Sequence, residues 1–208
     1  MEPSGRGSLL CAVNQGVTPL WQDLSRDASF WAFLRKVDEG IASDARSSGC
    51  LFCGAPLHSA SYKRKPRGPE VLTDGTRFSF CCSMDSCRKR LTPPSVRFLG
   101  RKVFVMASVV LVAAMRQGPT PARVRRIARL VGVSRRSVSR WTVWWTESFP
   151  KTALWQEGRS RFGEQVDPKS LPSSLLVYFK AGSSIDAFLG VLKFLSLLTR
   201  SGPGPPSS

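Results

Sequence analysis

Four cysteines occur in two closely spaced pairs that could bind one metal ion. Cys50 and Cys53 form a C-x2-C pair followed by Gly54, and Cys82 and Cys87 form a C-x4-C pair. Thiolates at these spacings can hold one tetrahedral Zn²⁺, and the glycine lets the backbone reverse direction after the first pair. Four soft sulfur ligands favour zinc among the common metals and leave no open coordination position. The sequence therefore predicts one structural Zn²⁺ bound by Cys50, Cys53, Cys82 and Cys87.

The sequence leaves two of these ligand assignments open. Cys81 could replace Cys82, because adjacent strand residues point to opposite faces of a sheet. His58, the one histidine of the chain, lies five residues after Cys53 and is an alternative ligand, although a lone histidine beside such a site is more often a neighbour of it. Cys11 stands apart near the N-terminus and is expected to be a small buried or free thiol.

The segment between the cysteine pairs is typical of a small β-hairpin. Leu57 to Lys65 and Arg77 to Cys81 have the composition of short strands, and turn residues separate them at 66–69 and 74–75. Two metal-binding turns that close a hairpin describe a zinc ribbon. The bound metal would supply folding free energy that so short a segment cannot obtain from a core.

Helices are predicted after the cysteine segment. Residues 101–117 are apolar almost all round, as in a buried helix, and Gly118 and Pro119 end that segment. Thr120 and Pro121 then provide the N-cap and first position of a helix that runs to about Leu130. This helix directs Val124, Ile127, Ala128 and Val131 inward and Arg123, Arg125, Arg126 and Arg129 outward.

A sharp turn and a further helix follow. Gly132 accommodates the turn, Ser134 caps the next helix, and that helix extends from Arg135 to Trp145. Val133 and Val138 are expected between the two helices, and Trp141, Trp144 and Trp145 share a helical face that is expected to lie in the core. The pattern resembles a helix-turn-helix, whose second helix enters the major groove of DNA.

The excess positive charge lies mainly in the middle of the chain. The formal net charge is +17, and residues 103–146 hold eight basic side chains and no acidic one. Residues 49–102 hold eleven basic and three acidic side chains. A block of one sign indicates a polyanionic partner, because a solvated face usually mixes signs. The missing carboxylates favour nucleic acid over a membrane surface or a bias in composition.

Candidate DNA contacts come from both basic segments. Those of the helical segment are Ser134, Arg135, Arg136, Ser137, Ser139, Arg140, Arg123 and Arg126. Those beside the cysteines are Lys63, Arg64, Lys65, Arg67, Arg88, Lys89 and Arg90, with Arg97, Arg101 and Lys102 in a further cluster. Arginine can pair bidentately with guanine, whereas the clusters near the metal suit contacts to phosphate.

The predicted fold class is mainly α, with a small zinc-ribbon β-hairpin module followed by a helix-turn-helix domain. The expected segments are an N-terminal tail (1–26), a helix capped by Asp27 (27–48), the zinc module (49–100), the helix-turn-helix (101–149), a C-terminal helical region (150–200) and a disordered tail (201–208). Phe30, Phe33 or Leu34, Val37 and Ile41 are expected on one face of the first helix. In the C-terminal region, residues 171–179 and 185–198 have the pattern of two amphipathic helices, and Phe188, Leu192, Leu195 and Leu198 could form a dimer contact.

The combination of CLFCG (50–54), RFSFCCSMDSCRKRLTPPSVRFLGRKVF (77–104) and IARLVGVSRRSVSRW (127–141) resembles the DNA-binding head of bacterial insertion-sequence transposases and related uncharacterised proteins. The resemblance covers about residues 50–146 and implies binding to the terminal repeats of a mobile element. It does not extend to the catalytic domain, which needs three carboxylates that hold two metal ions. After Trp145 the acidic residues are Glu147, Glu157, Glu164, Asp167 and Asp186, in too short a chain for such a domain.

The sequence thus predicts a zinc-stabilised, sequence-specific DNA-binding protein without a catalytic domain of its own. Its partners would be double-stranded DNA and a catalytic transposase or a second copy of the chain, in the cytoplasm at the nucleoid, where it could also regulate transcription. No apolar run reaches the ~18 residues of a membrane-spanning helix. The alternatives are an RNA-binding zinc-ribbon protein, a DNA nicking or joining subunit that uses Asp167 or Glu164 with a partner chain, and an adaptor that binds through residues 171–200.

Overall fold

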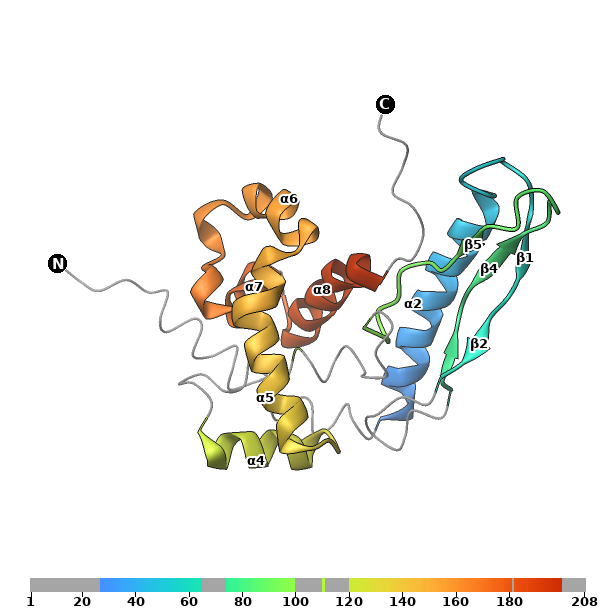
Figure 1. Cartoon of the computed structure of the whole chain (residues 1–208). Helices are drawn as coiled ribbons and strands as arrows, with labels where there is room; N and C mark the ends of the chain where they lie inside the picture. Colours follow the sequence, from blue (N-terminus) through green and yellow to red (C-terminus); the bar gives the residue numbers. More distant parts are fainter. Residues whose placement is uncertain (1–26, 65–73, 100–109, 111–119, 181, 200–208) are drawn as a thin grey trace. The chain divides into compact units, whose positions relative to one another are not determined.

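The computed structural model describes residues 27–64, 74–99, 110, 120–180 and 182–199. These residues fall into two units (Figure 1). We call Ala28–Met106 with Leu195–Ser208 the cysteine unit, and Met1–Asp27 with Ala107–Phe194 the helical unit. The described residues are mainly helical with a small antiparallel sheet, which confirms the predicted mainly α class.

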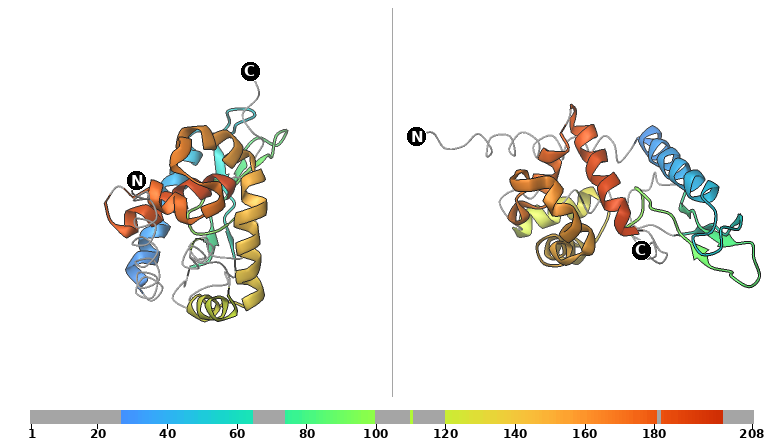
Figure 2. Two further views of the ribbon diagram at one scale, coloured as in Figure 1. Left: turned by 90° about the vertical axis from the view of Figure 1, so that its left-hand side faces the viewer. Right: turned by 90° about the horizontal axis from the view of Figure 1, so that it is seen from above.

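The cysteine unit combines one long helix with short strands. Helix α2 (Ala28–Ser47) lies alongside the sheet (Figure 2). The three-stranded antiparallel sheet has the order β1-β4-β5, and β2 pairs with β3 in a separate ladder. The strands are β1 (Leu57–Ser59), β2 (Tyr62–Lys63), β3 (Thr76–Arg77), β4 (Phe80–Cys82) and β5 (Arg90–Leu91). Ala42 on α2 packs with Leu57, Phe80, Cys82 and Leu91 of the sheet to form the core beside the cysteines.

The two predicted strands are each interrupted, which corrects the expectation of a plain hairpin. Residues 60–61 separate β1 from β2, and residues 78–79 separate β3 from β4. At the break the Ala60 amide donates to the Ser79 carbonyl at 2.8 Å, and the Ser61 hydroxyl lies 3.4 Å from the Ser79 amide. The serine hydroxyl thus replaces a ladder bond. Strand β5 was not predicted, and Lys65 lies outside the described residues.

Helix α2 begins directly after Asp27, as predicted, and its buried face agrees in part with the one expected. Phe30 and Leu34 are buried, whereas Phe33 is 46% exposed. Val37 and Ile41 are only half-buried. The fully buried stripe is Phe30, Trp31, Leu34, Asp38 and Ala42. The apolar pattern did not predict the whole buried stripe, because the acidic residue Asp38 lies within it.

Asp38 is buried because three donors satisfy its carboxylate. Its Oδ1 accepts from the Val96 amide at 2.7 Å, and its Oδ2 accepts from the Ser95 hydroxyl at 2.7 Å and from Nε of Arg97 at 2.8 Å. Arg97, expected on the basic surface, is 1% exposed and also donates to the carbonyls of Asp74 and Thr76. The pair attaches α2 to the segment after β5, and Arg97 is not available to phosphate.

Replacing Asp38 by Ala should destabilise the cysteine unit by about 3–5 kcal/mol, because it leaves the Arg97 guanidinium buried without its counterion. Equilibrium urea unfolding, followed by hydrogen exchange of peptides from residues 28–47, measures this loss. Glu39→Ala is the matched control: Glu39 is exposed and pairs with Arg35 at 2.8 Å, so its loss should cost less than about 1 kcal/mol. Equal stabilities of the two variants would contradict the role of Asp38.

In its described residues, the helical unit contains four whole helices and most of a fifth. The helices are α4 (Pro121–Leu130), α5 (Arg135–Val143), α6 (Ala153–Phe162), α7 (Ser173–Tyr178) and α8 (Ser184–Ser196), whose last residues belong to the cysteine unit. A π-helical turn (Trp144–Ser148) continues α5, and 3-10 turns span Phe149–Lys151, Gly163–Gln165, Pro168–Ser170 and Leu197–Thr199. The predicted helices at 171–179 and 185–198 are present with shorter bounds, whereas α6 was not predicted. No helix among the described residues is long and apolar enough to cross a membrane.

An aromatic core holds the C-terminal end of α5. Trp145 and Phe149 are fully buried, with ring centroids 4.8 Å apart, and Phe149 packs against Trp155 of α6 at 5.5 Å. Trp141 is also buried, as predicted, but Trp144 is half-buried. Phe188, Leu192 and Leu195 of α8 are buried and Leu198 is half-buried, and the dimer contact that they could form stays a prediction.

Several predicted features lie outside the described residues. They are the N-terminal segment with Cys11, the basic residues Lys65, Arg67, Arg101 and Lys102, the helix at 101–117 apart from the buried Val110, and the C-terminal tail.

Candidate functional site

The four predicted cysteines lie together in the cysteine unit. The sulfur atoms of Cys50, Cys53, Cys82 and Cys87 all lie within 4.8 Å of one another. The Cys50 and Cys87 sulfurs are 3.7 Å apart, and those of Cys53 and Cys82 are 3.4 Å apart. Four sulfurs about 2.3 Å from a tetrahedral Zn²⁺ are separated by about 3.8 Å, whereas a disulfide requires about 2.05 Å. The cluster therefore fits a metal ion rather than disulfides.

Two glycines shape the first metal-binding turn. Gly49 and Gly54 have φ angles of 73° and 72°, in the left-handed region that favours glycine. The Cys50 carbonyl accepts from the Gly54 amide at 2.8 Å, and the Cys50 amide donates to the Ala55 carbonyl at 2.9 Å. A Cβ at Gly49 would lie 2.9 Å from the Gly54 carbonyl oxygen. The end of α2 thus leads directly into a tight turn that brings two thiols to one side.

The second turn connects β4 to β5. Cys82 is the last residue of β4, and its amide donates to the Lys89 carbonyl at 2.9 Å. The Met84 carbonyl accepts from the amides of Cys87 and Arg88 at 3.0 and 2.9 Å, and Arg88 has a φ of 45°. These bonds close a turn that returns Cys87 to the metal side.

The surroundings of the thiols differ in how they affect ionisation. Backbone amides of Phe52 and Cys53 donate toward the Cys50 sulfur and lower its pKa to about 7. Burial raises the pKa of Cys82 to about 12, and its side chain is fully buried. A thiolate at Cys82 therefore needs a cation beside it, which a bound metal ion would provide.

The sheet register settles the two ligand alternatives. Leu57 pairs with Cys82, whereas His58 pairs with Cys81 and Cys81 with Arg90. Because directly paired residues share a face, His58, Cys81 and Arg90 lie on the outer face and Cys82 lies on the inner face. The Cys81 sulfur lies 3.5 Å from the Arg88 carbonyl, away from the cluster. Cys82 is therefore the member of the cluster, and neither Cys81 nor His58 belongs to it.

Purified protein should contain one equivalent of metal per chain, and Cys53→Ser should lose it because one of four sulfur ligands is removed. Cys81→Ser is the matched control, since it removes a neighbouring thiol from the opposite face and should keep the metal. Native mass spectrometry with elemental analysis gives the stoichiometry. A metal-free wild type, or loss of metal in Cys81→Ser, would exclude this site.

A side-chain cap begins each helix of the α4–α5 pair in the helical unit. The Thr120 hydroxyl accepts from the Arg123 amide at 3.3 Å at the start of α4, and the Ser134 hydroxyl accepts from the Ser137 amide at 3.2 Å at the start of α5. Gly132 has a φ of 65°, as the predicted turn requires. The predicted inward residues Val124, Ile127, Ala128 and Val131 are buried, as is Val138, while Val133 is half-buried. The helices are therefore placed as the sequence predicted.

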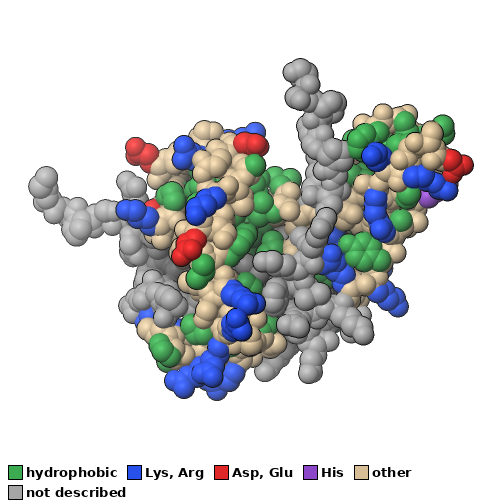
Figure 3. All heavy atoms as spheres, in the orientation of Figure 1, with side chains coloured by type: hydrophobic (Ala, Val, Ile, Leu, Met, Phe, Trp, Pro, Cys, Tyr) green, Lys and Arg blue, Asp and Glu red, His purple; other side chains and the backbone are tan. Residues whose placement is uncertain are grey.

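Most residues of α4 and α5 that the sequence predicted to contact DNA are exposed. Figure 3 shows the basic side chains gathered over α4. The exposed side chains are those of Arg125, Arg126, Arg129, Ser134, Arg135, Arg136, Ser139 and Arg140, and Arg123 is half-buried. Ser137 is the exception: it is 9% exposed, and its hydroxyl lies 3.1 Å from that of Ser134. Ser137 therefore supports the cap instead of presenting itself to a ligand.

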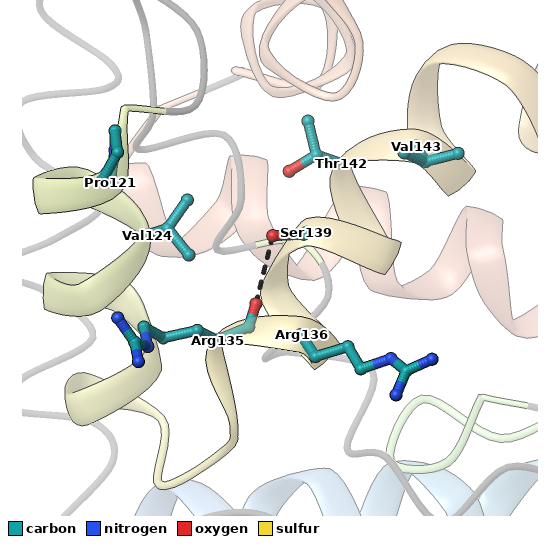
Figure 4. Close-up of a pocket in the computed structure, with 7 residues that line it drawn as sticks. All are labelled: Pro121, Val124, Arg135, Arg136, Ser139, Thr142 and Val143. Carbon is teal, nitrogen blue, oxygen red and sulfur yellow. Dashed lines mark hydrogen bonds between the residues drawn. The ribbon is translucent and has the colours of Figure 1, made fainter.

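A groove of about 490 Å³ lies between α4 and α5 (Figure 4). Arg135 points toward α4 and Arg136 points away from it. The groove is lined by Pro121, Val124, Arg135, Arg136, Ser139, Thr142 and Val143. Sequence reasoning missed Pro121, Thr142 and Val143 as lining residues, although Thr142 and Val143 follow Arg135 and Arg136 by seven residues and so share their helix face. Val124, predicted to point inward, is buried and also lines the groove.

The basic residues beside the cysteines are partly engaged with aromatic rings. The guanidinium groups of Arg64 and Arg90 lie 5.6 and 5.4 Å from the Tyr62 ring centroid, and the Lys89 ammonium lies 5.4 Å from that of Phe52. Arg90 also donates to the Ser79 hydroxyl and to the Ala60 carbonyl. Of the others, Lys63 is exposed and Arg88 pairs with Asp85 at 2.9 Å.

Asp167, one of the two carboxylates considered for catalysis, is engaged within its own turn. It accepts from the Lys169 amide at 2.9 Å and from the Ser170 hydroxyl at 2.7 Å, and these bonds lower its pKa. Glu164 is exposed in the preceding 3-10 turn. Within the part of the chain that the structure describes, the cysteine cluster is the one group of three or more potential metal ligands.

No family model matches the sequence, and no curated protein or solved structure matches it. The case for a function therefore depends on two features of the chain itself. These are the four-cysteine cluster and the arginine-bearing helix pair.

Proposed function

We propose that this chain is a zinc-stabilised, sequence-specific DNA-binding protein of the cytoplasm, related in function to the DNA-binding head of transposases. The observation that carries the proposal is the helix pair α4–α5. It bears Arg123, Arg125, Arg126, Arg129, Arg135, Arg136 and Arg140, and residues 103–146 contain no carboxylate. A helix pair with this many arginines and no carboxylate in its own segment favours a polyanion.

Zinc is the metal that best suits the four-thiol site. Four sulfur ligands at tetrahedral spacing select Zn²⁺ over the harder divalent ions, and a fully occupied coordination sphere gives it a structural role. The bound ion neutralises thiolate charge and joins the end of α2 to the β4–β5 turn. Its binding free energy adds to the stability of strands that are only two or three residues long.

Helix α5 is the element proposed to read base sequence. Two arginines in its first turn, Arg135 and Arg136, can each pair bidentately with O6 and N7 of guanine in the major groove. Ser139 and Arg140 lie one turn further along and can contact a base or a phosphate. The start of α4 is suited to bind a phosphate group. The backbone amides of a helix N-terminus carry partial positive charge, and the arginines of α4 add full positive charges.

The cysteine unit is proposed to add backbone affinity. Lys63, Arg64, Lys89 and Arg90 stand on and beside its sheet, and such contacts to phosphate carry no sequence information. In a mobile element, the two units together would hold the DNA end for a catalytic transposase, which is the partner that the transposase-like sequence indicates.

Two alanine variants should separate these roles on a duplex selected from a random pool. Arg136→Ala should weaken binding to the selected duplex about 10- to 100-fold and leave binding to random duplex nearly unchanged, because a bidentate base contact is lost. Lys63→Ala should weaken both duplexes by a similar, smaller factor and flatten the salt dependence by about one unit of slope. Fluorescence anisotropy at several salt concentrations measures all four affinities.

Lys151→Ala serves as the control, since Lys151 is an exposed cation on the turn after α5 and should not alter either affinity. If Arg136→Ala and Lys63→Ala had equal effects on selected and random duplex, the division of roles would be wrong. If neither protein nor variants bound duplex in dilute buffer, the proposed function would fail.

RNA or single-stranded binding is a second candidate, favoured by one observation. Phe52 is 50% exposed on the first metal-binding turn with the Lys89 ammonium beside its ring, an arrangement suited to stack an unpaired base next to a phosphate.

For this second candidate, Phe52→Ala should weaken single-stranded RNA binding about 5- to 100-fold, the cost of one lost base–aromatic stack. Phe33→Ala removes a ring of similar exposure from α2 and is its control. Competition experiments with duplex DNA and structured RNA measure the preference. Equal affinity for RNA and duplex would favour the RNA-binding protein, and an unchanged Phe52→Ala affinity would exclude base stacking at this ring.

A further inference from the structure

The groove between α4 and α5 combines charge at one end with an apolar surface at the other. Arg135 and Arg136 flank it at the start of α5, and Thr142 and Val143 line it near the end of that helix. The exposed Pro121 and the largely buried Val124 line the groove from the first turn of α4. A surface that only attracted phosphate would not need this apolar part.

Val143 is the residue that makes the groove unusual. Its side chain is 48% exposed, although it is apolar and β-branched, and it shares the outward face of α5 with Arg136 and Ser139. Seven residues, or two helical turns, separate Arg136 from Val143, which corresponds to about 10.5 Å along the helix axis. Base pairs of duplex DNA are about 3.4 Å apart, so this distance spans about three steps.

We propose that Val143, with the apolar wall of the groove, binds the 5-methyl group of a thymine that lies two to four base pairs from a guanine contacted by Arg136. This inference rests on the proposed function and names Val143 as a specificity-determining residue. The thymine methyl is the apolar group that unmodified DNA presents in the major groove. Adenine, guanine and cytosine would instead place donors or acceptors against Val143, Val124 and Pro121, which cannot pair with them.

The shared chemistry is a 5-methylpyrimidine, which thymine and 5-methylcytosine both provide. We assign thymine, because the charged side chains that line the groove, Arg135 and Arg136, are donors only and suit the O4 acceptor of thymine rather than the amino group of 5-methylcytosine. The Ser139 and Thr142 hydroxyls donate to the Arg135 and Val138 carbonyls at 3.2 Å, and their oxygens can still accept, which the 5-methylcytosine duplex tests.

The test begins with duplexes selected from a random pool by the full chain. At each selected T·A pair, thymine is replaced by deoxyuridine, which removes only the methyl group. At one position two to four base pairs from the selected guanine, this replacement should weaken wild-type binding about fourfold, as expected for the loss of one buried methyl group. The same replacement should leave the affinity of Val143→Ala unchanged.

Matched controls keep the result specific. Ile185→Ala removes another exposed apolar side chain of the helical unit. This variant should still bind the deoxyuridine duplex about fourfold more weakly than the thymine duplex, a difference that we call the uracil effect. Duplex with 5-methylcytosine·guanine at that position should bind the wild type more weakly than duplex with thymine. Circular dichroism should show that Val143→Ala is folded, since the side chain is half exposed.

Each outcome decides the proposal. A uracil effect that is present in the wild type and absent in Val143→Ala supports it. An absence of any uracil effect, or an equal effect in wild type and Val143→Ala, overturns it while leaving sequence-specific DNA binding intact. Equal or tighter binding of the 5-methylcytosine duplex overturns the assignment to thymine. Failure to select any duplex instead rejects the proposed function on which the inference rests.

Discussion

Four thiols within 4.8 Å of one another are the constraint on which the cysteine unit depends. They join the end of α2, the last residue of β4 and the turn before β5, elements that share only a small core. Burial disfavours the thiolate of Cys82, and several neighbouring thiolates would repel one another without a cation. A bound metal ion would convert this cost into a favourable interaction and would help strands of two or three residues to hold a fixed arrangement. The positions of the basic residues on these strands therefore depend on the formation of the cysteine cluster.

Five carboxylates outside the helix pair make local contacts. In the cysteine unit, Asp38 is buried against Arg97, Asp74 lies 2.8 Å from Arg35, and Asp85 lies 2.9 Å from Arg88. In the helical unit, Asp167 and Asp186 accept hydrogen bonds from their own turns. Acidic side chains thus serve local structure in both units. No carboxylate lies within residues 103–146, so the arginines of α4 and α5 have no acidic neighbour in their own segment.

Local patterns in the sequence were sufficient to predict the four-cysteine cluster and the helix pair. The two cysteine spacings, the caps at Thr120 and Ser134 and the glycine at 132 each depend on residues close together in the chain, and the structure has them as expected. The choice between Cys81 and Cys82 required the strand register, which the sequence alone does not determine. The sequence indicated that Cys81 and Cys82 point to opposite faces of the sheet, but it did not indicate which of the two points inward.

Features that depend on distant residues were missed. Asp38 and Arg97 are 59 residues apart in the sequence. Their charges suggested that both are exposed, whereas in the structure they form a buried pair. The hydroxyl of Ser61 interrupts a ladder that the strand pattern predicted to be continuous. Val143 reads as an ordinary apolar position, and only the geometry of the groove shows that it lies on the outward face with Arg136. Tertiary contacts, rather than propensity, decided each of these positions.

The salt dependence of duplex binding tests the central claim most directly. A protein that binds phosphates through exposed arginines and lysines releases one counterion for each phosphate it neutralises. The logarithm of the association constant should therefore fall linearly with the logarithm of salt concentration, with a slope of about −3 or steeper. An affinity that does not change with salt, or the absence of any complex in dilute buffer, would contradict the account.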